Sequence, residues 1–410
     1  MKTGSEKEKS KPKLLIILNR FVIGGQAADT IPLAWHLKND FKILILYGEK
    51  EKDEIEPSFL LHMYPGILLK KIKFLKRSLN PFIDVLAFFH ILSVIRGFKP
   101  SIVHTHGSKP GLLGRLAAYI SGVPVIIHTF HGHFFHSYFS KRISRFIAFL
   151  ERSIGKITTR SIALSDSQKN ELVSEYKIFP ASKIAVIPLG FAFPNQENSE
   201  ALRESFRKKY SLKEEDVAIG IVSRIVPVKN HSFFVNIIAE ILRSFTASPV
   251  AFFIVGDGEL RKRVEEELSQ KKVAFSNTAI DVKTRVVFTS WLTNIPEVMN
   301  GLDIVALTSL NEGTPLSIIE AQFFKKPVIA TNAGGVKDSM KDGITGFLIK
   351  QNDITTFCEK LCLLIDDKEL RSTMGKAGNK FATVTFSKHK EVTLTKNLYL
   401  SLLEERGIFL

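Results

Sequence analysis

Two glutamates that stand eight positions apart, Glu312 and Glu320, flank the expected start of a helix. Thr314 followed by Pro315 is typical of a helix N-terminus, where a hydroxyl caps the first turn and proline takes the first helical position. The free N–H groups and positive dipole of such a helix attract phosphate. One carboxylate could then contact a sugar while the other accepts hydrogen bonds from a ribose diol. An ordinary strand–loop–helix with two solvated glutamates explains this segment equally well.

Two cations, Arg224 and Lys229, stand five positions apart after an expected strand at Ala218–Val222. A diphosphate leaving group gathers negative charge as its bond breaks, and fixed positive charge stabilises it. Arginine can chelate two phosphate oxygens, whereas lysine offers a point charge. An Arg and a Lys in a loop are usually only solvated. This pair therefore indicates a phosphate site only when it is considered together with the glutamate segment.

Glycines follow three further expected strands, at Gly24–Gly25, at Gly256 and at Gly334–Gly335. Each glycine lets the backbone approach a ligand closely. Any tight turn has a similar composition, so none of the three is specific by itself.

Histidines are concentrated in the first half, where nine of the eleven occur before residue 195. Four of them, His128, His131, His133 and His136, crowd one stretch, and histidine is a common metal ligand. However, His128 and His131 flank an expected strand end, and the sequence contains no Asp-x-Asp pair of the kind that holds Mg²⁺ or Mn²⁺. We therefore expect no metal site.

The elements that must position these residues alternate between apolar strands and helices, which is typical of parallel sheets covered on both faces. Expected strands include Leu14–Leu18, Lys42–Tyr47, Ser101–His104, Val123–His128, Ile162–Leu164, Val250–Val255, Val286–Thr289, Ile304–Leu307 and Val328–Ala330. Helices are expected at Gly111–Ser121, His231–Ser244 and Leu260–Gln270. The sequence predicts an α/β fold of two doubly wound, Rossmann-like domains, residues 1–195 and 196–385, with 194–215 as linker and domain entry. Ligands should bind where strand ends face the cleft.

Length and composition agree with this organisation. A chain of 410 residues, 45% of them hydrophobic, is too long to fold around one ordinary hydrophobic core. The only two cysteines, Cys358 and Cys362, lie four apart in a helical segment, which favours buried thiols and a reducing compartment. The charged segment Met1–Lys13 is no signal peptide. We expect a cytoplasmic protein.

Positive charge is concentrated in the first half, where residues 1–195 hold 28 Lys and Arg against 14 Asp and Glu. Such a surface attracts anionic lipids, phosphorylated substrates or nucleic acid. Phe82–Phe98 is too interrupted to span a membrane and indicates a buried or interfacial helix. Phe130–Lys156 mixes aromatic and basic residues, which suits docking on an anionic membrane surface. A core-facing helix with a basic outer side is the alternative.

Together these segments resemble the group 1 (family 4) retaining glycosyltransferases, which have the GT-B fold of two Rossmann-like domains around a central cleft. The resemblance is carried by the Glu-x7-Glu element from Glu312 to Glu320 and by Asp303 before it. Lys326–Ala330, Gly334–Gly335 and the turn Asp342–Leu348 extend it. Residues 386–410 resemble the helix that crosses back onto the N-terminal domain in such enzymes.

The resemblance implies roles for individual residues. Gly24 and Gly25 would lie near the donor phosphates, His131 beside the transferred sugar, and Gly256 in the donor site. Arg224 and Lys229 would hold the diphosphate. Glu312 would contact the sugar and Glu320 the ribose. The phosphates would be surrounded by the segment Gly313, Thr314, Pro315, Leu316 and Ser317. All of these residues except the proline have a backbone N–H to donate.

The expected activity is transfer of a sugar from a nucleoside-diphosphate sugar, UDP favoured, to a lipid-linked or cell-surface glycan such as lipopolysaccharide. Transfer would retain the anomeric configuration and need neither cofactor nor metal. A sugar-nucleotide epimerase, a phosphorylase and a non-catalytic nucleotide-sugar-binding module are the alternatives. No nucleic-acid-binding motif was found.

Overall fold

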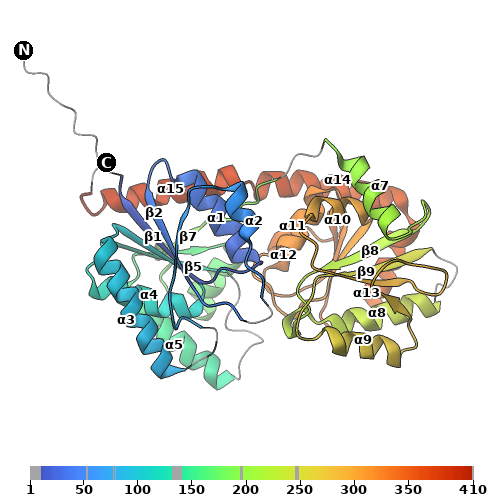
Figure 1. The fold of residues 1–410 in the computed structure, drawn as a ribbon, viewed down its shortest axis with the longest axis horizontal. Helices are drawn as coiled ribbons and strands as arrows, with labels where there is room; N and C mark the ends of the chain where they lie inside the picture. The colour runs from blue at the N-terminus through green and yellow to red at the C-terminus, as the bar shows by residue number, and fades with distance from the viewer. Residues whose placement is uncertain are drawn as a thin grey trace, which may run out of the picture. The chain divides into compact units, whose positions relative to one another are not determined.

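The computed structural model describes residues 11–51, 54–76, 78, 80–131, 141–193, 197–244 and 249–408. The chain forms two compact units (Figure 1). Among the described residues, unit 1 extends to Gly190 and takes up the chain again from Lys388, whereas unit 2 covers Phe191–Ser387. The described residues therefore pass from one unit to the other at Gly190–Phe191 and at Ser387–Lys388.

Unit 1 contains a seven-stranded parallel sheet in the order β3-β2-β1-β4-β5-β6-β7. Its strands are β1 (Lys13–Arg20), β2 (Lys42–Gly48), β3 (Leu68–Lys71), β4 (Ile102–His106), β5 (Val125–Phe130), β6 (Arg160–Ala163) and β7 (Ile184–Val186). Its helices are α1 (Gly25–Leu37), α2 (Ser58–Met63), α3 (Pro81–Phe98), α4 (Ser108–Ile120), α5 (Lys141–Ile157), α6 (Asp166–Asn170) and α15 (Lys388–Glu404).

Helices cover both faces of this sheet, as the uninterrupted apolar strands predict. Leu14, Ile16 and Leu18 of β1 share one buried cluster with α1 and α15. Leu15 and Ile17 point to the other face and share a second cluster with α3 and α4. The alternation along β1 thus assigns each helix to its side of the sheet.

Unit 2 repeats the architecture with the order β10-β11-β9-β8-β12-β13-β14. Its strands are β8 (Val217–Val222), β9 (Val250–Val255), β10 (Phe275–Ser276), β11 (Val286–Ser290), β12 (Ile304–Leu307), β13 (Val328–Thr331) and β14 (Gly346–Ile349). Its helices are α7 (Ser199–Lys209), α8 (His231–Ser244), α9 (Arg261–Gln270), α10 (Ile295–Gly301), α11 (Leu316–Phe323), α12 (Val336–Ser339), α13 (Ile354–Asp366) and α14 (Lys368–Thr385).

Both sheets have a switch point, where chain connections leave in opposite directions from two neighbouring strands. It lies between β1 and β4 in unit 1 and between β8 and β12 in unit 2. Open α/β sheets bind ligands outside the carboxyl ends of strands at this point. The prediction of two doubly wound, Rossmann-like folds is confirmed.

One expectation about the chain was wrong, because much of 194–215 is packed structure and not linker. Helix α7 buries Phe206, which is 1% exposed, against α10. A Cβ on Gly301 would lie 2.2 Å from the Phe206 ring, so the two helices meet at a glycine. The dense charges of α7 hid this apolar contact, and one of them, Arg207, is itself buried and donates to Asp303 and to the Asp216 carbonyl.

Helix α3 is the one helix in the described part of the chain whose length and composition would fit a membrane span, although 28% of it is buried. Ala87, Ile91 and Ile95 belong to the core cluster of unit 1, so α3 is a sheet-covering helix with an outer face. The predicted membrane segment at 130–156 cannot be compared in full, because residues 132–140 lie outside the described residues.

Candidate active site

The residues expected to bind phosphate lie at the switch point of unit 2. Arg224 and Lys229 follow β8, and Glu312 follows the neighbouring strand β12. The Leu310 N–H donates to the carbonyl of Val228 over 2.8 Å and joins the two loops. The parallel sheet thereby brings together the two loops that carry these groups from distant parts of the sequence.

Lys229 and Glu312 form an ion pair between Nζ and Oε1, and Ser309 Oγ donates to the same oxygen over 2.6 Å. Both side chains are largely enclosed, with exposed fractions of 19% and 11%. Among the described residues these contacts all use Oε1. Oε2 of Glu312 is therefore left to accept a hydrogen bond from a ligand hydroxyl.

Helix α11 begins at Leu316, and Pro315 takes the N-cap position with φ −72° and ψ 113°. No side chain caps this helix, so the predicted cap by the Thr314 hydroxyl was wrong. The extended ψ of Pro315 moves the helix start one residue onward, which puts Thr314 outside it. The first N–H groups bonded to the cap carbonyl are those of Ile318 and Ile319, at 3.2 and 3.5 Å. Earlier N–H groups of this turn can serve an anion.

The turn after β13 fixes the loop that carries Glu312. The Gly335 N–H donates to the Glu312 carbonyl over 2.9 Å. A Cβ on Gly335 would lie only 1.7 Å from the carbonyl oxygen of Gly313, so no larger residue fits without movement. Gly335, in the turn after β13, thus holds the loop in place through its backbone contacts with Glu312 and Gly313.

Glu320 lies on α11 with its carboxyl in desolvated surroundings but with part of the residue still exposed. Burial raises the pKa of Glu320 to about 8, because water no longer stabilises the anion. The carboxyl is thus mostly protonated at neutral pH. Hydroxyls that donate to it would favour its ionised form.

Gly256 contacts the chain's own backbone. It has φ +128°, and a Cβ there would lie 2.1 Å from the carbonyl oxygen of Ser223. Ile225 N–H also donates to the Asp257 carbonyl over 2.9 Å. This glycine supports the loop that carries Arg224, and its contact with a donor stays a prediction.

The site residues predicted in unit 1 lie at its own switch point. Gly24 and Gly25 follow β1 at the start of α1, and no side chain caps that helix. His131 follows β5, and its Nε2 lies 2.7 Å from Nδ1 of His106 at the end of β4. Burial lowers the pKa of both imidazoles. Two neutral rings that share one N–H therefore occupy this edge.

Two other histidines of this region are fully engaged in structure. His104 contacts Tyr399 Oη at 2.6 Å and Thr129 Oγ1 at 2.7 Å through its two ring nitrogens. His128 lies 2.9 Å from Thr105 Oγ1 and packs against Gly111 of α4. Within the described ranges no group of three His, Cys, Asp or Glu side chains is arranged for a metal ion. His133 and His136 fall outside those ranges.

The sequence reasoning missed a buried ionic cluster in which Lys388 Nζ contacts Asp29 at 2.9 Å and Glu391 at 2.5 Å. Burial opposes the ionisation of Asp29, yet the charge of Lys388 holds the pKa of Asp29 below its ordinary value. Burial raises the pKa of Glu391 well above its ordinary value. The cluster joins α1 to α15. Contacts 359 positions apart leave no local signal in the sequence.

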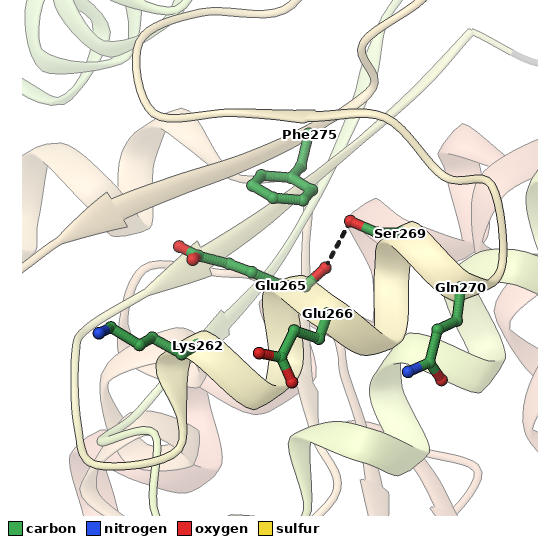
Figure 2. A pocket seen from close by; sticks show the side chains of 6 residues that line it. All are labelled: Lys262, Glu265, Glu266, Ser269, Gln270 and Phe275. Carbon is green, nitrogen blue, oxygen red and sulfur yellow. Dashed lines mark hydrogen bonds between the residues drawn. The ribbon is translucent and has the colours of Figure 1, made fainter.

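A hollow on α9 and β10 lies apart from these groups (Figure 2). It is lined by Lys262, Glu265, Glu266, Ser269, Gln270 and Phe275. Four of these six residues are exposed, and Ser269 Oγ donates to the Glu265 carbonyl over 2.9 Å. The hollow contains none of the predicted site residues and is a surface feature of one helix.

Two doubly wound sheets with polar groups at their switch points form the framework of an α/β enzyme of the nucleotide-binding type. The model of the family "Glycosyl transferases group 1" matches residues 203–381, and that of "Glycosyltransferase Family 4" matches residues 23–192. The chain belongs to this family of glycosyltransferases and has the GT-B fold.

Similar proteins agree with this assignment. An *Escherichia coli* UDP-Gal:alpha-D-GlcNAc-diphosphoundecaprenol alpha-1,3-galactosyltransferase is 33% identical over 80% of this chain and 82% of its own length. The *Staphylococcus aureus* capsular polysaccharide biosynthesis glycosyltransferase CapM is 27% identical over 81% of this chain and 84% of its own length. The crystal structure of *Anabaena* HepE in complex with UDP has a TM-score of 0.75 at 18% identity, covering 95% of this chain and all of that one.

Proposed function

We propose that this glycosyltransferase moves a sugar from a UDP-sugar to a lipid-linked or cell-surface glycan, with retention of configuration and without a metal ion. The observation that carries the proposal is the arrangement at the unit 2 switch point. There Arg224 and the Lys229–Glu312 pair lie on loops beside the uncapped start of α11. Fixed positive charge and free N–H groups at one place suit a diphosphate.

The choice of donor and acceptor rests on the relatives. The *E. coli* relative takes its sugar from UDP-Gal and acts on a diphosphoundecaprenol-linked GlcNAc, and the *S. aureus* relative serves capsular polysaccharide. We infer that the donor is a UDP-sugar in preference to a GDP-sugar and that the acceptor is a polyprenyl-diphosphate-linked glycan. The product would serve the synthesis of lipopolysaccharide or another surface polysaccharide.

The chemistry follows from where charge develops. The bond between the anomeric carbon and the β-phosphate oxygen breaks, and Arg224, Lys229 and the N–H groups at the start of α11 stabilise the departing diphosphate. The acceptor hydroxyl attacks the same face of the anomeric carbon and passes its proton to the departing phosphate oxygen. Glu312 Oε2 and His131 hold sugar hydroxyls, and Glu320 accepts from the ribose diol.

Metal independence is proposed on the same charges. A divalent cation would neutralise the diphosphate in enzymes that hold it with carboxylate pairs. Here two side-chain cations and a helix dipole supply the positive charge. Added EDTA should leave turnover unchanged, and a loss of turnover that Mg²⁺ or Mn²⁺ restores would contradict this part.

The test is transfer from radiolabelled UDP-sugars to GlcNAc-diphosphoundecaprenol, with the anomeric configuration of the product read by NMR. UDP should raise the melting temperature by mass action, and GDP should do so less. An inverted product would overturn the retaining mechanism.

Two rival functions are separated by simple controls. An epimerase would convert the donor in the absence of any acceptor. A non-catalytic binding module would bind UDP with the same affinity yet release no UDP from the UDP-sugar when acceptor is supplied. Unchanged turnover of a Glu312→Ala variant would also argue against the proposed site.

A further inference from the structure

Helix α3 presents an apolar stripe to the outside. Phe82, Val85, Leu86 and Phe89 are exposed to 85%, 53%, 50% and 60%. Positions i, i+3, i+4 and i+7 lie on one side of a helix. The opposite side belongs to the core of unit 1. Burial of four large apolar side chains is therefore available to a partner, and the sugar-transfer site does not use it.

The edge strand β3 and the turn after it place cations beside this stripe. Lys70 and Lys73 are exposed. Lys71 is also exposed, but it lies with Leu69 on the opposite face of the sheet. The charges of Lys70 and Lys73, after burial, help to lower the pKa of His90 on α3, so both lysines lie near that helix. Leu68 and Phe74, which are 57% and 40% exposed, add apolar area among them.

Acidic residues are nearly absent around the stripe. Between Glu56 and Glu151 the sequence has a single acidic residue, Asp84, and Lys109 binds it over 2.6 Å. Glu49 accepts from the Phe74 N–H over 3.2 Å and lies 3.5 Å from Lys76, whose charge offsets that carboxylate. In the described part of the chain no ion pair involves Lys70 or Lys73.

The stripe lies at the functional edge of the sheet. It occupies the N-terminal half of α3, and the Asp84–Lys109 pair ties that half to the start of α4. Helix α4 begins two residues after His106, so the N-terminal ends of α3 and α4 lie at the carboxyl ends of the strands. Figure 1 shows α3 and α4 side by side on one face of the unit 1 sheet.

We propose that this face, the α3 surface, docks on an anionic lipid bilayer. It consists of Leu68, Phe74, Phe82, Val85, Leu86 and Phe89 with Lys70 and Lys73. Aromatic and aliphatic side chains enter the interface, while the lysines contact phosphate headgroups. A symmetric contact between two copies would bring the same lysines together, and their repulsion disfavours it. The proposal stands independently of the sugar transferred, and it would deliver a lipid-linked acceptor to the edge that carries His106 and His131.

The experiment is flotation of the full-length protein with vesicles of phosphatidylcholine alone and with 30% phosphatidylglycerol (roughly the anionic fraction that produces a strong surface potential). Binding should favour the anionic vesicles and weaken as salt rises. Two variants test the surface: Phe82→Asn with Phe89→Asn, and Lys70→Gln with Lys73→Gln. Each lysine near an anionic surface contributes roughly a fivefold change in binding, so the lysine variant should bind about twentyfold more weakly. The phenylalanine variant loses two side chains that would be buried in the interface, and it should bind at least about tenfold more weakly.

Matched variants in unit 2 serve as controls. Val282→Asn with Val384→Asn removes apolar groups that are 95% and 66% exposed. Lys283→Gln with Lys376→Gln removes the same charge from exposed positions. Both controls should float like the wild type. All variants should keep the wild-type circular dichroism and the wild-type turnover of a short-chain acceptor in detergent, which separates docking from sugar transfer.

Three outcomes would overturn the proposal: equal binding to neutral and anionic vesicles, no binding to either, or anionic binding that the α3 variants leave unchanged. Light scattering identifies the main alternative. In that case the wild type forms dimers that the Phe82→Asn, Phe89→Asn variant does not form, and it binds no vesicles. That result would show that the α3 surface is an interface between two copies of the chain, and it would refute membrane docking.

Discussion

The two units carry polar side chains at equivalent places, the switch points of seven-stranded parallel sheets, but the groups differ in charge. Unit 2 holds Arg224 and the Lys229–Glu312 pair there. Unit 1 holds His106 and His131, whose pKa values burial lowers, so they are neutral at physiological pH. The comparison teaches that a shared topology selects the position of a site while the loop residues decide which ligand charge it can balance.

Removing the cations of unit 2 should have the largest effect. The double variant Arg224→Ala, Lys229→Ala is expected to lose at least about a thousandfold in kcat/KM, because the departing diphosphate loses its fixed charges. Steady-state release of UDP measures it. Lys283→Ala, at an exposed position of unit 2, is the control and should behave as the wild type. Intact turnover in the double variant would show that the cations of unit 2 do not stabilise the diphosphate, so the two units would not differ in the way described.

Gly335→Ala tests whether the backbone behind Glu312 matters. The added methyl would overlap the Gly313 carbonyl and displace the loop, and a shift of about 1 Å at a reacting group costs roughly a hundredfold in kcat/KM. Gly97→Ala is the matched control, since nothing lies within 4 Å of its added Cβ. Equal kinetics for the two variants would show that the loop yields without cost.

The histidine pair of unit 1 should contribute less. His131→Ala and His106→Ala are each expected to lower kcat/KM about tenfold, the worth of one hydrogen bond to a neutral hydroxyl. Because the rings share a hydrogen bond, the double variant should be no worse than His131→Ala alone. Additive losses would mean that His106 acts independently of His131.

The smallest effect concerns protonation of Glu320. Its pKa is about 8 in the free protein, and ribose hydroxyls that donate to it would lower that pKa in the complex. Donor binding then releases a proton, so affinity for a UDP-sugar should increase about fivefold from pH 7 to pH 8 and level off above. Calorimetry in buffers of different ionisation enthalpy measures the proton. Glu320→Gln should bind with the same affinity at both pH values.

Much of the fold could be predicted from the sequence, because a doubly covered parallel sheet leaves uninterrupted apolar runs. The bounds of β9, β12 and α8 agree with the predicted Val250–Val255, Ile304–Leu307 and His231–Ser244. Helix α7 was missed, since its one buried aromatic residue lies among charged residues in the sequence.

Arg224, Lys229, Glu312 and Glu320 could be proposed from the sequence because a diphosphate and its sugars demand particular residue types, and their contact with a donor stays a prediction. Partnerships across the fold could not be predicted. The hydrogen bond of His106 to His131 depends on which strands become neighbours. Whether Thr314 caps α11 depends on the ψ of Pro315, which composition does not determine.

The late position of α15 in the chain affects how the protein is made. Tyr399, Leu402 and Leu403 cover the face of the unit 1 sheet to which Leu14, Ile16 and Leu18 point. Lys388 neutralises Asp29 in the interior of unit 1. The ribosome synthesises these residues only after all of unit 2. The nascent first unit must therefore wait with an uncovered apolar face and an unpaired buried aspartate, a state that invites chaperones and proteases. The described residues of unit 2 all precede α15 in the chain, so unit 2 can fold before unit 1 is complete.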